Sequence, residues 1–94
     1  MKAKRPGHDI NAAFTRAVLS SVLPIVKKVT TPAERKEAWV YNHGRSHWEF
    51  HGPEEFYWHG TADNAADARS KGWYAWLDQL EKDPAALVAR LYEM

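Results

Sequence analysis

The chain of 94 residues contains no cysteine. This absence excludes a disulfide framework, a thiolate zinc site and a thiol nucleophile, and it suits a reducing compartment. No apolar run approaches the roughly 18 residues that span a bilayer, and no cleavage signal follows the basic start MKAKRPGHD. We therefore expect a cytoplasmic protein that does not enter the membrane.

Recognisable catalytic motifs are also missing. The sequence has no H-E-x-x-H, no G-x-S-x-G and no glycine-rich phosphate loop. A histidine that acts as a general base needs a nucleophile, an orienting acid and a pocket, and no such combination is apparent. We expect a protein that is not an enzyme and that uses no cofactor and no metal.

What the chain does contain is typical of one packed domain. Apolar residues make up 45 % and aromatic residues 13 % of it, and 94 residues are too few for two separate cores. Residues 1–36 carry eight basic and two acidic residues, whereas residues 37–94 carry five basic and ten acidic residues. A basic end and an acidic end can each attract a partner of opposite charge.

The first third of the chain predicts a basic arm and then a helix. Pro6-Gly7 interrupts regular structure, so residues 1–8 are expected to be a flexible basic arm, followed by one domain over 9–94. Asp9 is a suitable N-cap for a helix that Pro24 kinks or divides. One apolar stripe of this helix includes Ile25 and Val29. A second side of the helix carries Leu19, Leu23 and Val26. These residues are expected to pack against a second copy of the chain, in a groove of a partner, or against a second layer within the domain.

The rest of the chain predicts a short helix, three strands and two further helices. Thr31-Pro32-Ala33-Glu34 has the pattern of a capping box, which favours a helix over 32–37. Aromatic runs separated by turn residues predict antiparallel strands at 38–42, 46–51 and 55–59. A long helix follows from Thr61 or Asp63 to Lys82, in which Gly72 indicates close approach to the sheet. The last helix is expected to close the core with Leu87, Val88 and Leu91.

The fold class is therefore α+β, and its notable feature is a segment, residues 43–60, with four histidines and five large aromatic residues. Because strand side chains alternate between two faces, a three-residue loop at 52–54 places Trp48 opposite Trp58 and Phe50 opposite Phe56 in the core. The same register places His47 opposite His59 and Glu49 opposite Tyr57 on the outer side. The candidate contact residues on and beside that side are Arg45, His47, Glu49, His51, Tyr57 and His59.

Three roles for this histidine-rich side remain open. Aromatic and histidine side chains suit contact with a protein or nucleoprotein. Direct binding of DNA or RNA is the second hypothesis, because basic residues neutralise phosphates. A metal-binding or pH-responsive histidine cluster is the third. The residues expected to contact nucleic acid in the second hypothesis are Lys2, Lys4, Arg5, Lys27, Lys28 and Arg45.

Residues 48–77 show a resemblance. The segment WEFHGPEEFYWHG, followed by ADNAADARSKGWYAWL, resembles short uncharacterised proteins of bacterial plasmids and phages, a gene pool in which small regulators and inhibitors of host defence are common. The strands followed by a helix look like the arrangement in AP2-type and integrase arm-type DNA-binding domains, and the full order of elements is similar to that of double-stranded-RNA-binding domains. The chain departs from both patterns: His and Glu mostly replace the basic strand residues of AP2-type domains, and DNAADARSKG replaces the Lys-rich helix start of the double-stranded-RNA binders. The resemblance implies a bacterial protein that acts by binding.

Overall fold

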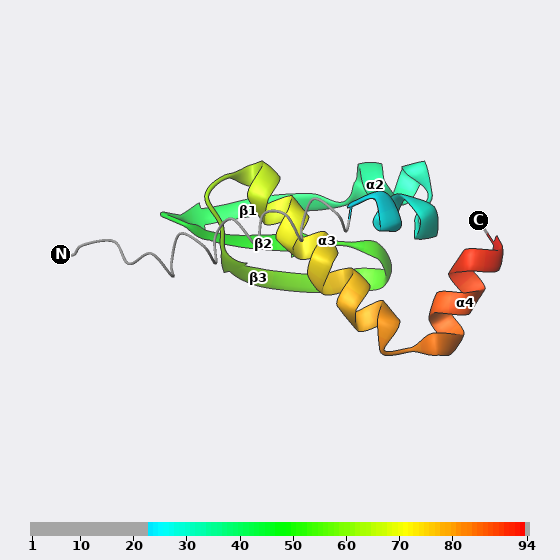
Figure 1. Cartoon of the computed structure of the whole chain (residues 1–94). Coiled ribbons are helices and arrows are strands. Elements are labelled where there is room, and N and C mark those ends of the chain that lie inside the picture. Colours follow the sequence, from blue (N-terminus) through cyan, green and yellow to red (C-terminus); the bar gives the residue numbers. More distant parts are fainter. Residues whose placement is uncertain (1–22, 94) are drawn as a thin grey trace.

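The computed structural model describes residues 23–93 and has the predicted α+β fold (Figure 1). Two predicted features lie outside the described residues: the basic arm over 1–8 and most of the first predicted helix. Residues 23–29, the last part of that predicted helix, are helical. None of the helices in this described part is both long enough and apolar enough to cross a membrane. The elements that follow are α2 (Pro32–Glu37), β1 (Trp39–Gly44), β2 (His47–His51), a 3-10 turn η1 (Pro53–Glu55), β3 (Tyr57–Thr61), α3 (Ala65–Glu81) and α4 (Pro84–Glu93).

The start of α2 confirms the capping box. The Oγ1 atom of Thr31 accepts a hydrogen bond from the Glu34 backbone N–H at 3.1 Å, and Glu34 Oε1 accepts one from the Thr31 N–H at 2.9 Å. Both bonds satisfy N–H groups that lack a partner within the helix. The helix ends at Glu37, and the chain enters β1 through the buried Ala38.

The three strands form an antiparallel sheet in the order β1-β2-β3. The predicted register between β2 and β3 is wrong by two residues, because Phe50 pairs with Trp58 and Glu49 pairs with His59. The connection is longer than three residues: Gly52 N–H donates to Phe56 O at 2.9 Å, and η1 fills the space between them. A shift of two preserves which face each side chain occupies, so the predicted division of the strand into two faces holds.

The inner face of the sheet packs against α3 through Phe50 and Gly72. Phe50 is fully buried, and a Cβ atom placed on Gly72 would lie 2.1 Å from Phe50 Cγ. Trp73 packs edge-to-face against Phe50 with ring centroids 5.1 Å apart, and Trp76 packs in the same manner against Trp73 at 5.3 Å. The close approach predicted from a glycine inside a helix is therefore confirmed.

The helical residues 23–29 correct one detail of the predicted stripes. Val26 and Val29 are both buried in the core, whereas Leu23 and Ile25 are exposed. The buried side of this helix is centred between Val26 and Val29. At 3.6 residues per turn, Leu23 and Ile25 lie on either side of that centre and therefore face solvent. The predicted stripes paired Ile25 with Val29 and Val26 with Leu23. Both pairs are wrong, because one member of each is buried and the other is exposed.

The last helix agrees with the prediction in part. Leu87 packs against the core, whereas Val88 and Leu91 are about half exposed and do not close it. Arg90 makes the main polar contact instead. Its two terminal nitrogens donate to the two carboxylate oxygens of Glu34 at 3.0 Å, one of them also donates to Val29 O at 2.9 Å, and the guanidinium lies 5.0 Å from the Trp76 ring. The hydrogen bonds from Arg90 lower the pKa of Glu34. A bidentate pair of this kind ties α4 to α2.

The contact between Phe50 and Gly72 gives a testable prediction. In an exposed helix, alanine is more favourable than glycine by about 1 kcal/mol. At position 72 we expect the opposite order, because an added methyl group meets the Phe50 ring and overpacking costs about 1 to 3 kcal/mol. Gly72→Ala should lower the free energy of unfolding measured in urea.

The control is the exposed Ala66 in the first turn of α3. There, Ala66→Gly should lower the free energy of unfolding by no more than the roughly 1 kcal/mol that glycine costs in a helix interior, through backbone entropy alone. If Gly72→Ala stabilised the protein, the contact between Phe50 and α3 would not be as close as described.

Candidate functional site

The side of the sheet opposite α3 is lined by aromatic, histidine and carboxylate side chains. These residues alternate with the inward-facing Val40, Trp48, Phe50 and Trp58, and most of them are exposed to solvent. The set is called the outer sheet face below, and it consists of Trp39, Tyr41, His43, His47, Glu49, His51, Tyr57 and His59.

Glu49 occupies the centre of the outer sheet face. Its position on β2, the middle strand, pairs with Tyr41 on β1 and with His59 on β3. The structure thus brings together five of the six contact residues expected from the sequence. The sixth, Arg45, is exposed in the turn between β1 and β2 and has a positive φ of 58°, so it stands at the end of the face.

Two histidines hold the Glu49 carboxylate. His43 Nε2 contacts Glu49 Oε2, and His51 Nε2 lies 2.5 Å from Glu49 Oε1. An ionised carboxylate only accepts hydrogen bonds, so each ring carries a proton on Nε2. The hydrogen bond from His51 and the one from His43 lower the pKa of Glu49. The carboxylate is consequently shielded, and only 15 % of its side chain is exposed.

The rings of the outer sheet face form a continuous series of contacts across all three strands. Trp39 and His51 are stacked in parallel, with centroids 3.8 Å apart and an angle of 3° between their planes. The remaining ring pairs have centroids 4.9 to 5.7 Å apart and are His51–Tyr57, Tyr57–His59, His59–His47, His47–His43 and His43–Tyr41.

The Tyr57 hydroxyl lies close to the Glu49 carboxylate. Partial burial, and after it the charge of Glu49, raises the pKa of the Tyr57 hydroxyl.

Three members of this face, Trp39, Tyr41 and His43, are not among the contact residues expected from the sequence. Trp39 and Tyr41 are 49 % and 53 % exposed, as much as Tyr57 at 49 %. The signal was the alternation in WVYNH, which places Trp39, Tyr41 and His43 on one side of β1. The pairing of Tyr41 with Glu49 shows that this side is the outer one.

The basic residues expected to contact nucleic acid do not gather at this face. Lys27 and Lys28 are exposed on the helical residues 23–29, and Arg45 is exposed in the turn between β1 and β2, at the opposite end of the sheet (Figure 1). Lys2, Lys4 and Arg5 lie outside the described residues. Within residues 23–93, no three His, Asp or Glu side chains are placed to hold a metal ion together.

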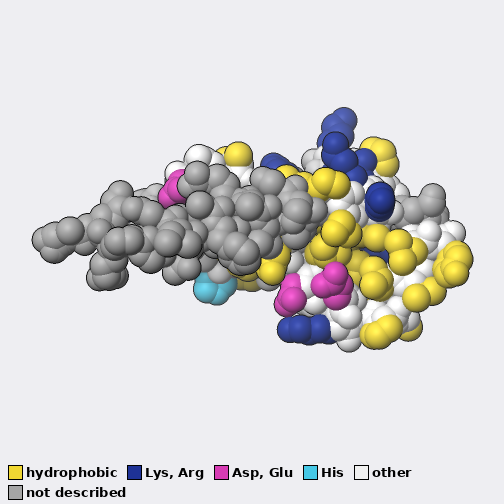
Figure 2. All heavy atoms as spheres, in the orientation of Figure 1, with side chains coloured by type: hydrophobic (Ala, Val, Ile, Leu, Met, Phe, Trp, Pro, Cys, Tyr) yellow, Lys and Arg dark blue, Asp and Glu magenta, His cyan; other side chains and the backbone are white. Residues whose placement is uncertain are grey.

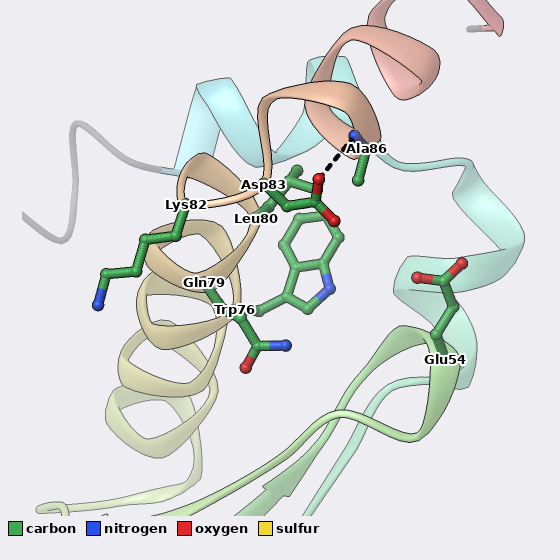
Figure 3. Close-up of a pocket in the computed structure, with 7 residues that line it drawn as sticks. All are labelled: Glu54, Trp76, Gln79, Leu80, Lys82, Asp83 and Ala86. Carbon is green, nitrogen blue, oxygen red and sulfur yellow. Dashed lines mark hydrogen bonds between the residues drawn. The ribbon is translucent and has the colours of Figure 1, made fainter.

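The helix-bearing side of the molecule has a different character. Hydrophobic side chains gather around α4 (Figure 2), where Val88, Leu91 and Tyr92 are exposed. A cavity of about 280 Å³ lies beside them (Figure 3) and is lined by Glu54, Trp76, Gln79, Leu80, Lys82, Asp83 and Ala86.

The two carboxylates of this cavity have structural roles. Asp83 Oδ1 accepts a hydrogen bond from the Ala86 N–H at 3.3 Å and so caps α4, as the dashed line in Figure 3 marks. Glu54 lies 3.7 Å from Arg90, the residue that joins α4 to α2. We therefore place the candidate site on the outer sheet face and not in this cavity.

Comparison of the chain with protein-family models, with curated proteins and with solved structures finds no match. The case for a function therefore depends on the geometry of the outer sheet face.

The lowered pKa of Glu49 predicts a pH-dependent contribution to stability. A carboxyl group whose pKa is lower in the folded state stabilises the fold above its ordinary pKa of 4.5, and this contribution is lost as pH falls through the lowered value. Glu49→Gln should therefore lower the melting temperature at pH 6, and the difference from wild type should shrink towards pH 3. Glu55→Gln, which changes an exposed carboxylate in η1, is the control. A difference that did not change with pH would argue against the two histidine contacts.

Proposed function

We propose that the protein is a stoichiometric binding protein, a regulator or inhibitor, whose outer sheet face docks on a protein or nucleoprotein target. The observation that carries this proposal is the continuous series of half-exposed rings across three strands. Trp39, Tyr41 and Tyr57 each keep about half of their surface exposed to solvent. The resemblance of residues 48–77 to short plasmid and phage proteins is in keeping with such a role in a bacterial host.

The chemistry of the face suits a protein interface. Protein interfaces are enriched in aromatic residues and depleted in Lys and Glu at their centre. The outer sheet face has no lysine, and its single carboxylate is engaged by His43 and His51. A partner therefore meets little unpaired charge at the centre of the face, and desolvation there costs less than it would for a free carboxylate.

The face is also ordered before any partner arrives. Each ring contacts at least one other ring, and Trp39 stacks on His51. Side chains that are already fixed lose little conformational entropy on binding. A sheet, unlike a loop, keeps these contacts in a constant arrangement, which favours recognition of one shape.

Direct binding of single-stranded nucleic acid is the second candidate, because one observation favours it. The Trp39 ring stacks on His51 and is still half exposed, which is the arrangement on which a nucleobase stacks. Phosphate neutralisation is the weaker part of this candidate, since Arg45 lies in the turn at one end of the sheet and the helical segment that carries Lys27 and Lys28 lies near the other end.

A capture experiment tests the proposal. The tagged protein is incubated with bacterial lysate, with and without nuclease, alongside a Tyr41→Ala, Tyr57→Ala double variant. We expect a captured protein that survives nuclease treatment and falls at least about tenfold with the double variant, because two aromatic contacts of about 1 kcal/mol each are lost.

Tyr74→Ala is the matched control, since Tyr74 is 41 % exposed but lies on α3, on the other layer of the molecule. This variant should capture the same protein as wild type. Capture that required nucleic acid and weakened steeply with salt would favour the second candidate. Equal loss with Tyr74→Ala, or no loss with the double variant, would remove the outer sheet face as the contact surface.

A further inference from the structure

The two edges of the sheet are protected to different degrees. The β1 edge is interrupted, because the register shifts between Asn42 and Gly44, Asn42 Oδ1 accepts the Gly44 N–H, and Gly44 has a φ of 114°. β3 reads YWHGT, with no proline, no lysine and no acidic residue, and its pairing with β2 is uninterrupted. Natural sheets usually blunt an edge with bulges, proline or charge. The β3 sequence has none of these, and the charge at this edge comes from Lys71 on α3.

The backbone of β3 leaves hydrogen-bonding groups at this edge. Gly52 N–H donates to Phe56 O, and Ala62 N–H donates to Ser46 O. Since bonded pairs alternate along an antiparallel ladder, the even-numbered residues between them bond to β2. The N–H and C=O groups of Tyr57, His59 and Thr61 therefore point away from the sheet. Lys71 Nζ donates to Thr61 O at 2.9 Å, so this carbonyl faces outward. A carbonyl oxygen has two lone pairs, so Thr61 O can accept a second bond from another strand.

We infer that the β3 edge pairs with the β3 edge of a second copy of this chain, antiparallel and about a two-fold axis at His59. In this register His59 lies opposite His59 of the other copy, and Tyr57 lies opposite Thr61. These are the residues whose backbone groups face outward, so they exchange the N–H···O bonds. The inference concerns a surface other than the outer sheet face and goes beyond the proposed function.

The side chains fit this register. Trp58 falls opposite Gly60 of the other copy, in the pairs where strands lie closest. Within one copy the Trp58 indole already covers Gly60, with Cζ2 2.7 Å from the place a Cβ would take, so the strand presents a ring next to a residue that has no side chain. No carboxylate or ammonium group on β3 meets its own copy across the axis.

The helix layer fits the same symmetry. α3 crosses the sheet diagonally, from β1 near the Thr61 end to beyond β3 near the Tyr57 end (Figure 1). A two-fold axis at His59 places the end of α3 that extends beyond β3 in one copy next to the Thr61 end of β3 in the other copy. At that end, the α3 of the other copy lies towards β1 and away from the shared edge. Both outer sheet faces then lie on the same side of one six-stranded sheet.

Analytical ultracentrifugation from micromolar concentrations up to about 1 mM tests the inference. We expect the mass of wild type to rise towards twice the 10.8 kDa of one chain. His59→Lys should remain monomeric, because like charges then lie directly opposite each other. His59→Pro should also remain monomeric, because it removes the outward N–H without breaking a bond to β2.

His47→Lys is the matched control, since it makes the same change on β2, one strand away from the edge. It should dimerise as wild type does, and circular dichroism should show that all variants fold. A wild-type chain that stays monomeric up to about 1 mM would overturn the inference. So would a dimer that persists in both His59 variants, or one that His47→Lys abolishes equally.

Discussion

The contact between Phe50 and Gly72 fixes the relation between the sheet and the helix that covers it. Phe50 stands on the central strand and is fully buried, and α3 comes close enough only because position 72 has no side chain. Once Phe50 points inward, the alternation of strand side chains sets the direction of every neighbour. Trp48 and Trp58 go to the helix side, and Glu49 goes to the solvent side.

That alternation produces the outer sheet face. Glu49 lies on the central strand, so His43 from the neighbouring β1 and His51, two residues further along β2, both reach its carboxylate. The rings of three strands then meet in series, starting with Trp39 stacked on His51. A surface with fixed aromatic area and little unpaired charge has the properties of a contact surface for another macromolecule, which is why the proposed function rests on it.

Local chemistry explains which predictions held and which did not. The Thr31 capping box depends on residues three apart and was readable from the sequence. The β2–β3 register was not, because Glu54 and Glu55 adopt positive φ values of 56° and 65° in a five-residue connection. Such values are uncommon for residues other than glycine, so the sequence indicated a shorter turn. The predicted faces survived because the error was an even number of residues.

The sequence by itself determined the α+β class, the order and approximate positions of the elements from residue 31 onwards, and the separation of the Trp and Phe rings from the histidines on β2 and β3, since each follows from spacing along the chain. Only the tertiary structure decided which rings meet, because that depends on the register between strands. It also decided that Arg90, and not Val88 or Leu91, joins α4 to the rest of the protein. The reason is that Glu34 and Arg90 lie far apart in the sequence, and spacing within one helix does not reveal a partner on another.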